Sequence, residues 1–141
     1  MAKMSLEECR ALLLTQAHTG QLATVREDGS PHVVPIWFDL DGETIVFTTG
    51  ENVIKARNIR HDARVSLCVD DERPPFSYVR VDGTATFSDD MEQLLYWATR
   101  IAGRYMGADK AEAYGKRNAV PGELLVRITP TRIHGEKNIS D

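Results

Sequence analysis

The sequence predicts a mainly β protein with helices (α+β), in which six antiparallel strands form a split β-barrel. Six strand-like segments occur in 141 residues, and most consecutive pairs are joined by short turns. Asp28-Gly29 and Asp41-Gly42 are typical of tight hairpin turns, because glycine tolerates the positive φ that such turns require. Six strands around a small core close most easily as a barrel with helices at its ends or side.

The strands are expected at residues 20–26, 32–39, 44–49, 64–69, 77–87 and 124–135. Pro31 and Pro35 cannot donate hydrogen bonds to a neighbouring strand, so part of the second strand should lie at a sheet edge, a bulge or a ligand. Gly83, inside the fifth strand, predicts a bulge and a sharp bend. Strands and helices do not alternate, which disfavours a doubly wound parallel fold.

Helices are expected in three regions of the chain. Ser5 and Glu8 have the form of a capping box, and Leu6, Cys9 and Leu13 would then share one face of a helix that ends near residue 16. A short helix is expected at about 53–61. Apolar side chains at helical spacing predict the longest helix over 90–106, and a shorter, charged helix follows within 107–118.

Composition indicates one ordinary globular domain spanning residues 1–141, with 42% hydrophobic and 27% charged residues. No apolar run approaches the roughly 20 residues of a membrane helix, and the N-terminus lacks the apolar core of a signal peptide, so we expect a cytoplasmic protein without a membrane partner. The formal net charge of −4 gives no reason to expect nucleic acid as a partner. Cys9 and Cys68 show no CxxC spacing, and a disulfide framework is not expected.

Residues 47–64 are locally cationic in this acidic chain. Thr48, Thr49 and Gly50 end a strand, and the helix that follows carries Lys55 and Arg57. Hydroxyls, a glycine and a helix N-terminus followed by cations are the parts of an anion site, because free backbone N–H groups and positive charge both favour a phosphate. The segment therefore predicts a phosphorylated cofactor. The alternative is a solvated surface helix.

The order of these elements resembles the flavin-binding split-barrel family, the fold of pyridoxamine 5′-phosphate oxidase. Residues 22–37 resemble the family's opening hairpin, residues 47–58 its phosphate-binding turn and helix, and residues 77–83 its long strand beside the ring system. The short chain and the Lys-Ala-Arg-Asn-Ile-Arg-His-Asp-Ala-Arg run of residues 55–64 resemble the small branch that uses coenzyme F420, a deazaflavin. The stretch Val33-Val-Pro-Ile-Trp37 lacks the arginines that grip the flavin phosphate in the oxidases.

The resemblance implies cofactor-binding roles for several residues of the cationic segment. Lys55 matches the family lysine that contacts the cofactor phosphate, and the alternative is a solvent lysine. Arg57 would bind the phosphodiester, reach an anionic tail or make a surface ion pair. Asn58 would cap or pack. Thr48 and Thr49 would bond to a phosphate or simply fill the strand.

The resemblance also implies residues beside the ring. Val34, Pro35 and Ile36 would form the wall under it, and Trp37 would stack nearby or belong to the core. On the substrate side we expect Phe76, Ser77 and Tyr78. Tyr78 is the candidate catalytic residue, as a hydrogen-bond donor to substrate, or else an ordinary interface tyrosine. The histidines lack metal-ligand spacing, so no metal site is expected.

The function expected from this resemblance is that of an F420-dependent oxidoreductase. A homodimer would bind the deazaflavin at its subunit interface. Hydride would pass between the cofactor and an electron-poor small molecule such as an enone, a quinone or a tetrapyrrole. Two alternatives stay open: an FMN-dependent oxidase or reductase on the same fold, and a non-catalytic binder of a cofactor or haem-like pigment.

Overall fold

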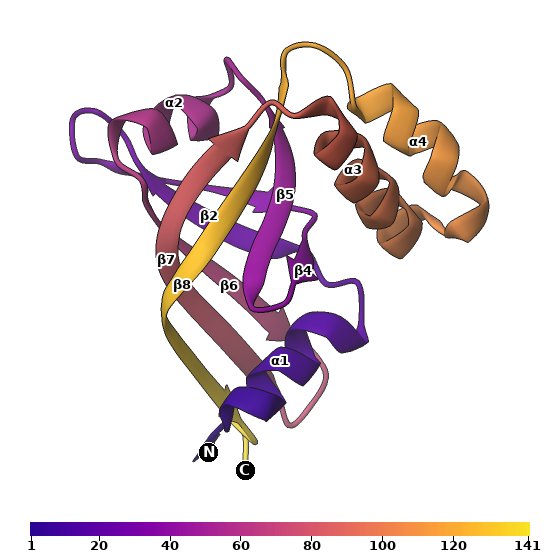
Figure 1. Ribbon diagram of the computed structural model, residues 1–141. Coiled ribbons are helices and arrows are strands. Elements are labelled where there is room, and N and C mark those ends of the chain that lie inside the picture. Colours follow the sequence, from indigo (N-terminus) through magenta and orange to yellow (C-terminus); the bar gives the residue numbers. More distant parts are fainter.

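The computed structural model describes residues 1–141 as a mixed α+β fold built on an antiparallel sheet (Figure 1). The helices are α1 (Leu6–Thr15), α2 (Ile54–His61), α3 (Met91–Met106) and α4 (Ala111–Asn118), with a 3₁₀ turn at Ala108–Lys110. The strands are β1 (Ala2–Lys3), β2 (Gly20–Val25), β3 (Pro31–Ile36), β4 (Asp39–Asp41), β5 (Thr44–Gly50), β6 (Arg64–Asp71), β7 (Ser77–Ser88) and β8 (Glu123–Lys137). No helix combines the length and the apolarity needed to cross a bilayer.

The mixed α+β class and the antiparallel pairing are confirmed, but the sheet has eight strands where six were expected. One additional strand is β1, which pairs with the end of β8. The other arises because the expected strand at 32–39 is broken at Trp37 and Phe38, so that β3 and β4 are separate. Pro130 does not interrupt β8, which runs continuously through it.

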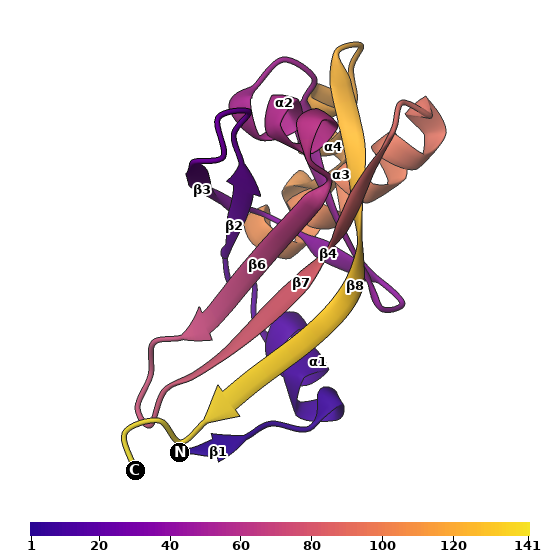
Figure 2. The same ribbon diagram turned by 90° about the vertical axis from the view of Figure 1, so that its left-hand side faces the viewer.

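The sheet curls because its two ends are joined by a short corner. The strand order is β3-β2-β6-β7-β8-β5-β4, so β3 and β4 lie at opposite ends of the hydrogen-bonded path. Only Trp37 and Phe38 separate these two strands in the chain. The ends of the sheet must therefore meet in space, although no hydrogen-bonded ladder closes them into a complete barrel (Figures 1 and 2).

Two local predictions about the strands are confirmed. The strand β3, which contains Pro31 and Pro35, pairs only with β2 and is an edge strand. The register of β7 against β8 shifts between Asp82 and Gly83, so an irregularity lies at the predicted glycine, with the extra residue, Thr131, in β8. A side chain at position 83 would approach the Thr129 carbonyl oxygen to 2.5 Å, which explains why glycine is needed there.

The core fills the space inside the curled sheet. Its largest fully buried side chains include Phe38, Phe47, Leu22 and Leu67. The helix α1 begins with the predicted capping box of Ser5 and Glu8 and packs Cys9 and Leu13 into this core. Leu6 lines one hollow with Cys9 and Leu13, as their spacing on one helix face predicted, but it stays 69% exposed at the first turn.

The helices α3 and α4 follow β7 and precede β8 in the chain, and they form a hairpin that lies beside β5 (Figure 1). The inner face of α3 buries Leu94 and Trp97 against the sheet residues Val46 and Leu125. The two helices meet at Gly115 of α4, where an added Cβ would lie 2.1 Å from the Thr99 hydroxyl oxygen and 2.9 Å from the Thr99 Cα. The absence of a side chain at position 115 therefore sets the spacing of the hairpin.

We expect Gly115→Ala to lower the free energy of unfolding by about 1–3 kcal/mol, because the added methyl group meets the backbone of α3 and must separate the helices. Gly103→Ala is the matched control on the same hairpin. Its Cβ would approach only the Ala111 Cβ, at 3.2 Å, while alanine favours the helix. Urea denaturation measures both variants, and equal stability of the two would contradict the role given to Gly115.

Candidate functional site

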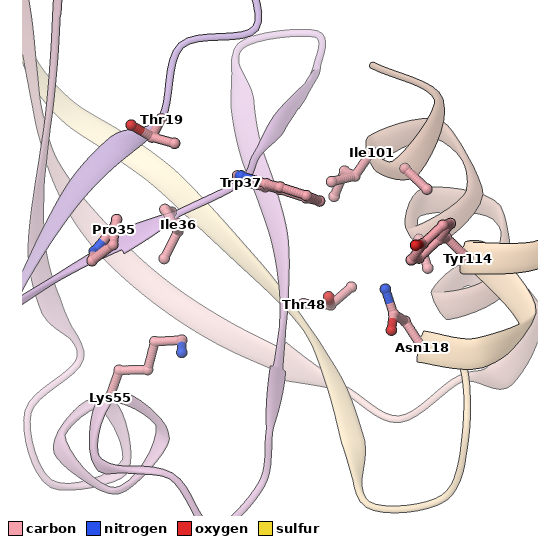
Figure 3. A pocket seen from close by; sticks show the side chains of 11 residues that line it. Thr19, Pro35, Ile36, Trp37, Thr48, Lys55, Ile101, Tyr114 and Asn118 are labelled. Atoms are coloured by element: carbon pink, nitrogen blue, oxygen red, sulfur yellow. The ribbon is translucent and has the colours of Figure 1, made fainter. Parts of the chain in front are cut away.

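One cavity lies where the sheet corner, α2 and the α3–α4 hairpin come together (Figure 3). Its volume is about 390 Å³, within the usual range of ligand pockets. It is lined by Thr19, Pro35, Ile36, Trp37, Thr48, Lys55, Ala98, Ile101, Ala102, Tyr114 and Asn118. Residues far apart in the sequence thus form a single site, with a cation on one side and helix residues on the other.

Lys55 is the only charged residue that lines the cavity. Its side chain leaves the first turn of α2 and points toward the centre of the site (Figure 3). Burial lowers the pKa of its ammonium group, and the negative charge of Glu123 opposes this effect without forming an ion pair. Lys55 is therefore a half-buried cation with no partner in the chain, which is the state that a bound anion would relieve.

Uncharged polar groups extend the site away from Lys55. The side chains of Thr48, Tyr114 and Asn118 line the same cavity and make no hydrogen bond within the chain. Figure 3 shows Thr48 between Lys55 on one side and Tyr114 and Asn118 on the other. These free donors and acceptors are available to a ligand that spans the cavity.

Trp37 gives the cavity a flat aromatic wall. Its ring stacks on Tyr105 with centroids 4.8 Å apart and planes 4° apart, and 43% of the residue stays exposed. The Tyr105 hydroxyl donates to the His18 carbonyl at 2.7 Å and accepts from the Phe38 N–H at 3.2 Å. Since hydrogen bonds hold the backing ring, the free face of Trp37 is a rigid surface on which a planar ligand can stack.

Ion pairs of the buried Asp39 fix the corner that carries Trp37. The carboxylate of Asp39 lies 3.4 Å from Arg100 and 3.5 Å from Arg104, both on α3. Arg104 also donates to the carbonyls of Leu13 and Gln16 at the end of α1. The cluster joins three elements next to the cavity, and we assign it a structural role because none of its charged groups lines the site.

Some of the residues expected to bind the cofactor are brought into the cavity and others are not. Lys55, Thr48, Pro35, Ile36 and Trp37 line it together. In the case of Trp37, the structure favours the cavity wall over the core.

Three other expected residues make different contacts within the chain. Thr49 is buried, and its hydroxyl donates to the Gly50 carbonyl at 3.3 Å. Asn58 is buried and donates to the Thr24 hydroxyl at 3.0 Å, which makes it a packing residue within this chain. Val34 is half-buried and is paired with Leu22 in the sheet.

Arg57 lies on the other side of α2 from the cavity, because two residues correspond to a turn of about 200° around a helix. It lines an open surface hollow with Arg26 and Arg60, in which Glu27 is the only acidic side chain. Any contact between Arg57 and a ligand at Lys55 must therefore reach around the helix.

The expected substrate-side residues lie elsewhere in this chain. Phe76, Ser77 and Tyr78 are at the start of β7, near the chain termini and far from α3 (Figures 1 and 2). Phe76 is exposed, and the ring of Tyr78 lies 6.1 Å from that of His134. Within one chain they do not share the cavity with Lys55.

Tyr114 and Asn118 are the site residues that the sequence did not reveal. They come from α4, which reads as a short, charged surface helix. The available signal was an aromatic and an amide four residues apart, and therefore on one helix face. Nothing local in the sequence shows that this face meets β5 and α2.

The pattern of the pyridoxamine 5′-phosphate oxidase family matches residues 5–137, which is nearly the whole chain. The chain belongs to this family. The family is one of flavin-type cofactor binders, and its fold is the split barrel that the sequence resembled.

Solved structures of similar proteins have the same fold. A conserved hypothetical protein of Mycobacterium tuberculosis shares 27% identity with a TM-score of 0.84, over 97% of this chain and 87% of that one. An F420 reductase shares 32% identity with a TM-score of 0.69, over 87% of this chain and 94% of that one. An FAD-binding protein of Mesorhizobium loti shares 23% identity with a TM-score of 0.72, over 95% and 93%, and shows the fold alone.

The residues of the cavity fit a flavin-type cofactor of this family. A phosphate needs a cation and hydrogen-bond donors, which Lys55 and Thr48 offer. A fused ring system needs a flat apolar surface, which Trp37 offers together with Pro35 and Ile36. The arrangement can bind an anion at one end and hold a planar ring beside the sheet.

Because burial lowers the pKa of Lys55 in the folded protein, its charged form costs stability at neutral pH. The cost disappears as pH rises from the lowered pKa through the unfolded value of about 10.4. We therefore expect Lys55→Met to leave the free energy of unfolding at pH 7 unchanged or up to about 0.5 kcal/mol higher. The free energy of unfolding of the wild type should rise relative to that of the variant as pH is raised toward 10.

The free energies of unfolding of wild type and Lys55→Met are measured by urea denaturation at several pH values. Lys137→Met is the control, because Lys137 pairs with Glu8 and its removal should lower stability at pH 7. A clear loss of stability in Lys55→Met at neutral pH would show that Lys55 has a stabilising partner in the free protein.

Proposed function

We propose that this protein binds the deazaflavin F420 and transfers hydride between the cofactor and an electron-poor small molecule. One observation carries the proposal: Lys55 is a half-buried cation without an ion pair, in a cavity that also presents the free face of Trp37. The 32% identity to an F420 reductase supports the choice of cofactor.

Each residue of the cavity has a defined task in this proposal. Lys55 neutralises the cofactor phosphate, and Thr48 donates a hydrogen bond to it. Pro35 and Ile36 form the wall along the ring, and Trp37 excludes water from its edge. The bound cofactor supplies the hydride chemistry, so the protein mainly positions two rings and keeps them dry.

FMN is the second candidate cofactor. A phosphate at Lys55 does not distinguish FMN from a deazaflavin, because the same cation serves both. The strand β3 (Pro31–Ile36) contains no arginine, and this favours F420. A non-catalytic carrier of cofactor or pigment is the third possibility and becomes an outcome of the experiment.

We expect F420 to bind more tightly than FMN when both are titrated by fluorescence. Lys55→Ala should weaken F420 binding roughly ten- to a hundredfold, because it removes one charge-assisted hydrogen bond of about 1.5–3 kcal/mol. The rate at saturating cofactor should change little, since the phosphate lies remote from the reacting ring. Lys110→Ala, an exposed change outside the cavity, is the control.

If FMN bound tenfold more tightly than F420, the cofactor would be FMN and not the deazaflavin. An unchanged F420 affinity in Lys55→Ala would refute the anion site. Tight F420 binding without turnover of any enone, quinone or tetrapyrrole would favour the carrier.

The proposal includes a homodimer, in which residues 76–78 of the second protomer would approach the ring. The apolar stripe of α3 supports an interface, because Met91, Leu95 and Tyr96 remain exposed after the inner face of the helix is buried. On the edge strand β3, Val33 is 63% exposed. Unpartnered apolar surface of this kind is typical of interaction sites.

We expect a dimer at micromolar concentration in sedimentation equilibrium. Val33→Glu should shift the population toward monomer if β3 takes part, because a charge would be buried at the interface. Thr86→Glu, an exposed change on β7, is a control. A monomeric wild type would contradict both the proposed dimer and a cofactor site shared between two protomers.

A further inference from the structure

We propose that Tyr114 and Asn118 form a polar pair that binds the carbonyl oxygen of the hydride acceptor. The proposal rests on the proposed function and adds to it the acceptor end of the site. Tyr114 and Asn118 lie on α4, across the cavity from Lys55 (Figure 3). The ligand that they recognise is a planar conjugated ketone or quinone.

The spacing of the pair suits a shared target. Residues four apart on a helix lie on the same face, and both side chains line one cavity. A phenol O–H and an amide NH₂ are both donors, and neither is used within the chain. Two donors on one face can converge on a single carbonyl oxygen.

Tyr114 is the only tyrosine of the chain that can perform this task at the cavity. The hydroxyl of Tyr105 is already bonded to His18 and Phe38. Tyr78 lies at the start of β7, and Tyr96 is on the exposed side of α3. The role expected of Tyr78 at the acceptor is thus assigned to Tyr114 within this protomer.

The walls around the pair define the class of acceptor. On α3, Ala98, Ile101 and Ala102 line this side of the cavity, and Trp37 adds its aromatic face. Small and apolar walls accept a flat carbon skeleton. Lys55 is the only charge in the cavity, so at the other end a charged acceptor would find no counter-ion.

The position of the pair is set by the helix hairpin. Gly115, directly after Tyr114, lets α4 pack against Thr99 of α3. Arg117 lies over the face of the Tyr114 ring, 5.5 Å from its centroid, and packs against it. Tyr114→Phe keeps the ring and both of these contacts, and removes only the hydroxyl.

The test uses menadione, a naphthoquinone, as the probe. Its affinity for the cofactor-free protein is measured by calorimetry, and KM and kcat are measured with F420 in its reduced form. Tyr114→Phe and Asn118→Ala should each weaken menadione binding about three- to tenfold, as expected for loss of one neutral hydrogen bond. KM should rise with them, while F420 affinity stays within twofold and the melting temperature is unchanged. Lys116→Ala, on the exposed side of α4 and outside the cavity, should alter none of these.

Lys55→Ala should show the opposite pattern, with weaker F420 binding and unchanged menadione affinity. Failure of the proposed function would appear as absent F420 binding in wild type, while the calorimetric comparison of menadione affinities still stands. Menadione affinity within twofold of wild type in both α4 variants would overturn the acceptor pair. The acceptor pair would also be overturned if the α4 variants lost more F420 affinity than menadione affinity. The same holds if wild type did not bind menadione at millimolar concentration.

Discussion

The corner at Trp37 and Phe38 is the constraint on which the rest of the structure depends. There the chain leaves one end of the sheet and starts the other, so the sheet must curl for these two residues to span the gap. Phe38 is fully buried inside the curl, while Trp37 faces the cavity. Asp39 follows directly and is held by Arg100 and Arg104 of α3. One short turn thus fixes the shape of the core and the position of the helix hairpin.

At this corner, the residues that stabilise the fold differ from the residues that are available to a ligand. The ion pairs of Asp39 and the hydrogen bonds of Tyr105 are internal to the fold, and they leave one face of Trp37 free. Lys55 is different, because it is half-buried without an ion pair and only the charge of Glu123 offsets part of this burial. A buried charge left without a partner lowers stability, and such residues concentrate at functional sites. The contrast between Asp39 and Lys55 distinguishes the structural cluster from the binding cluster.

The sequence predicted most of the fold because the decisive signals were local. The turn at Asp28-Gly29 needs the positive φ of its glycine, and the prolines of β3 lack the N–H that an inner strand must donate. Gly83 lies where a Cβ would meet the Thr129 carbonyl. Lys55 and Thr48 could also be found, because a strand end and the helix after it are close in sequence. Tyr114 and Asn118 could not, since their meeting with Thr48 is set by how a helix hairpin packs on a distant strand.

The α3–α4 hairpin is an excursion between two strands that pair with each other along almost the whole length of β7. Its residues 89–122 leave the sheet at Ser88 and return at Glu123, so the ladder would survive if they changed in length or sequence. Lys55 and Thr48 belong to other segments and would keep their places. A protein built in this way can admit new ligands by altering α4 and the turns beside it, as loops on a rigid scaffold permit. Arg100, Arg104 and Tyr105 of α3 would continue to hold the corner that carries Trp37.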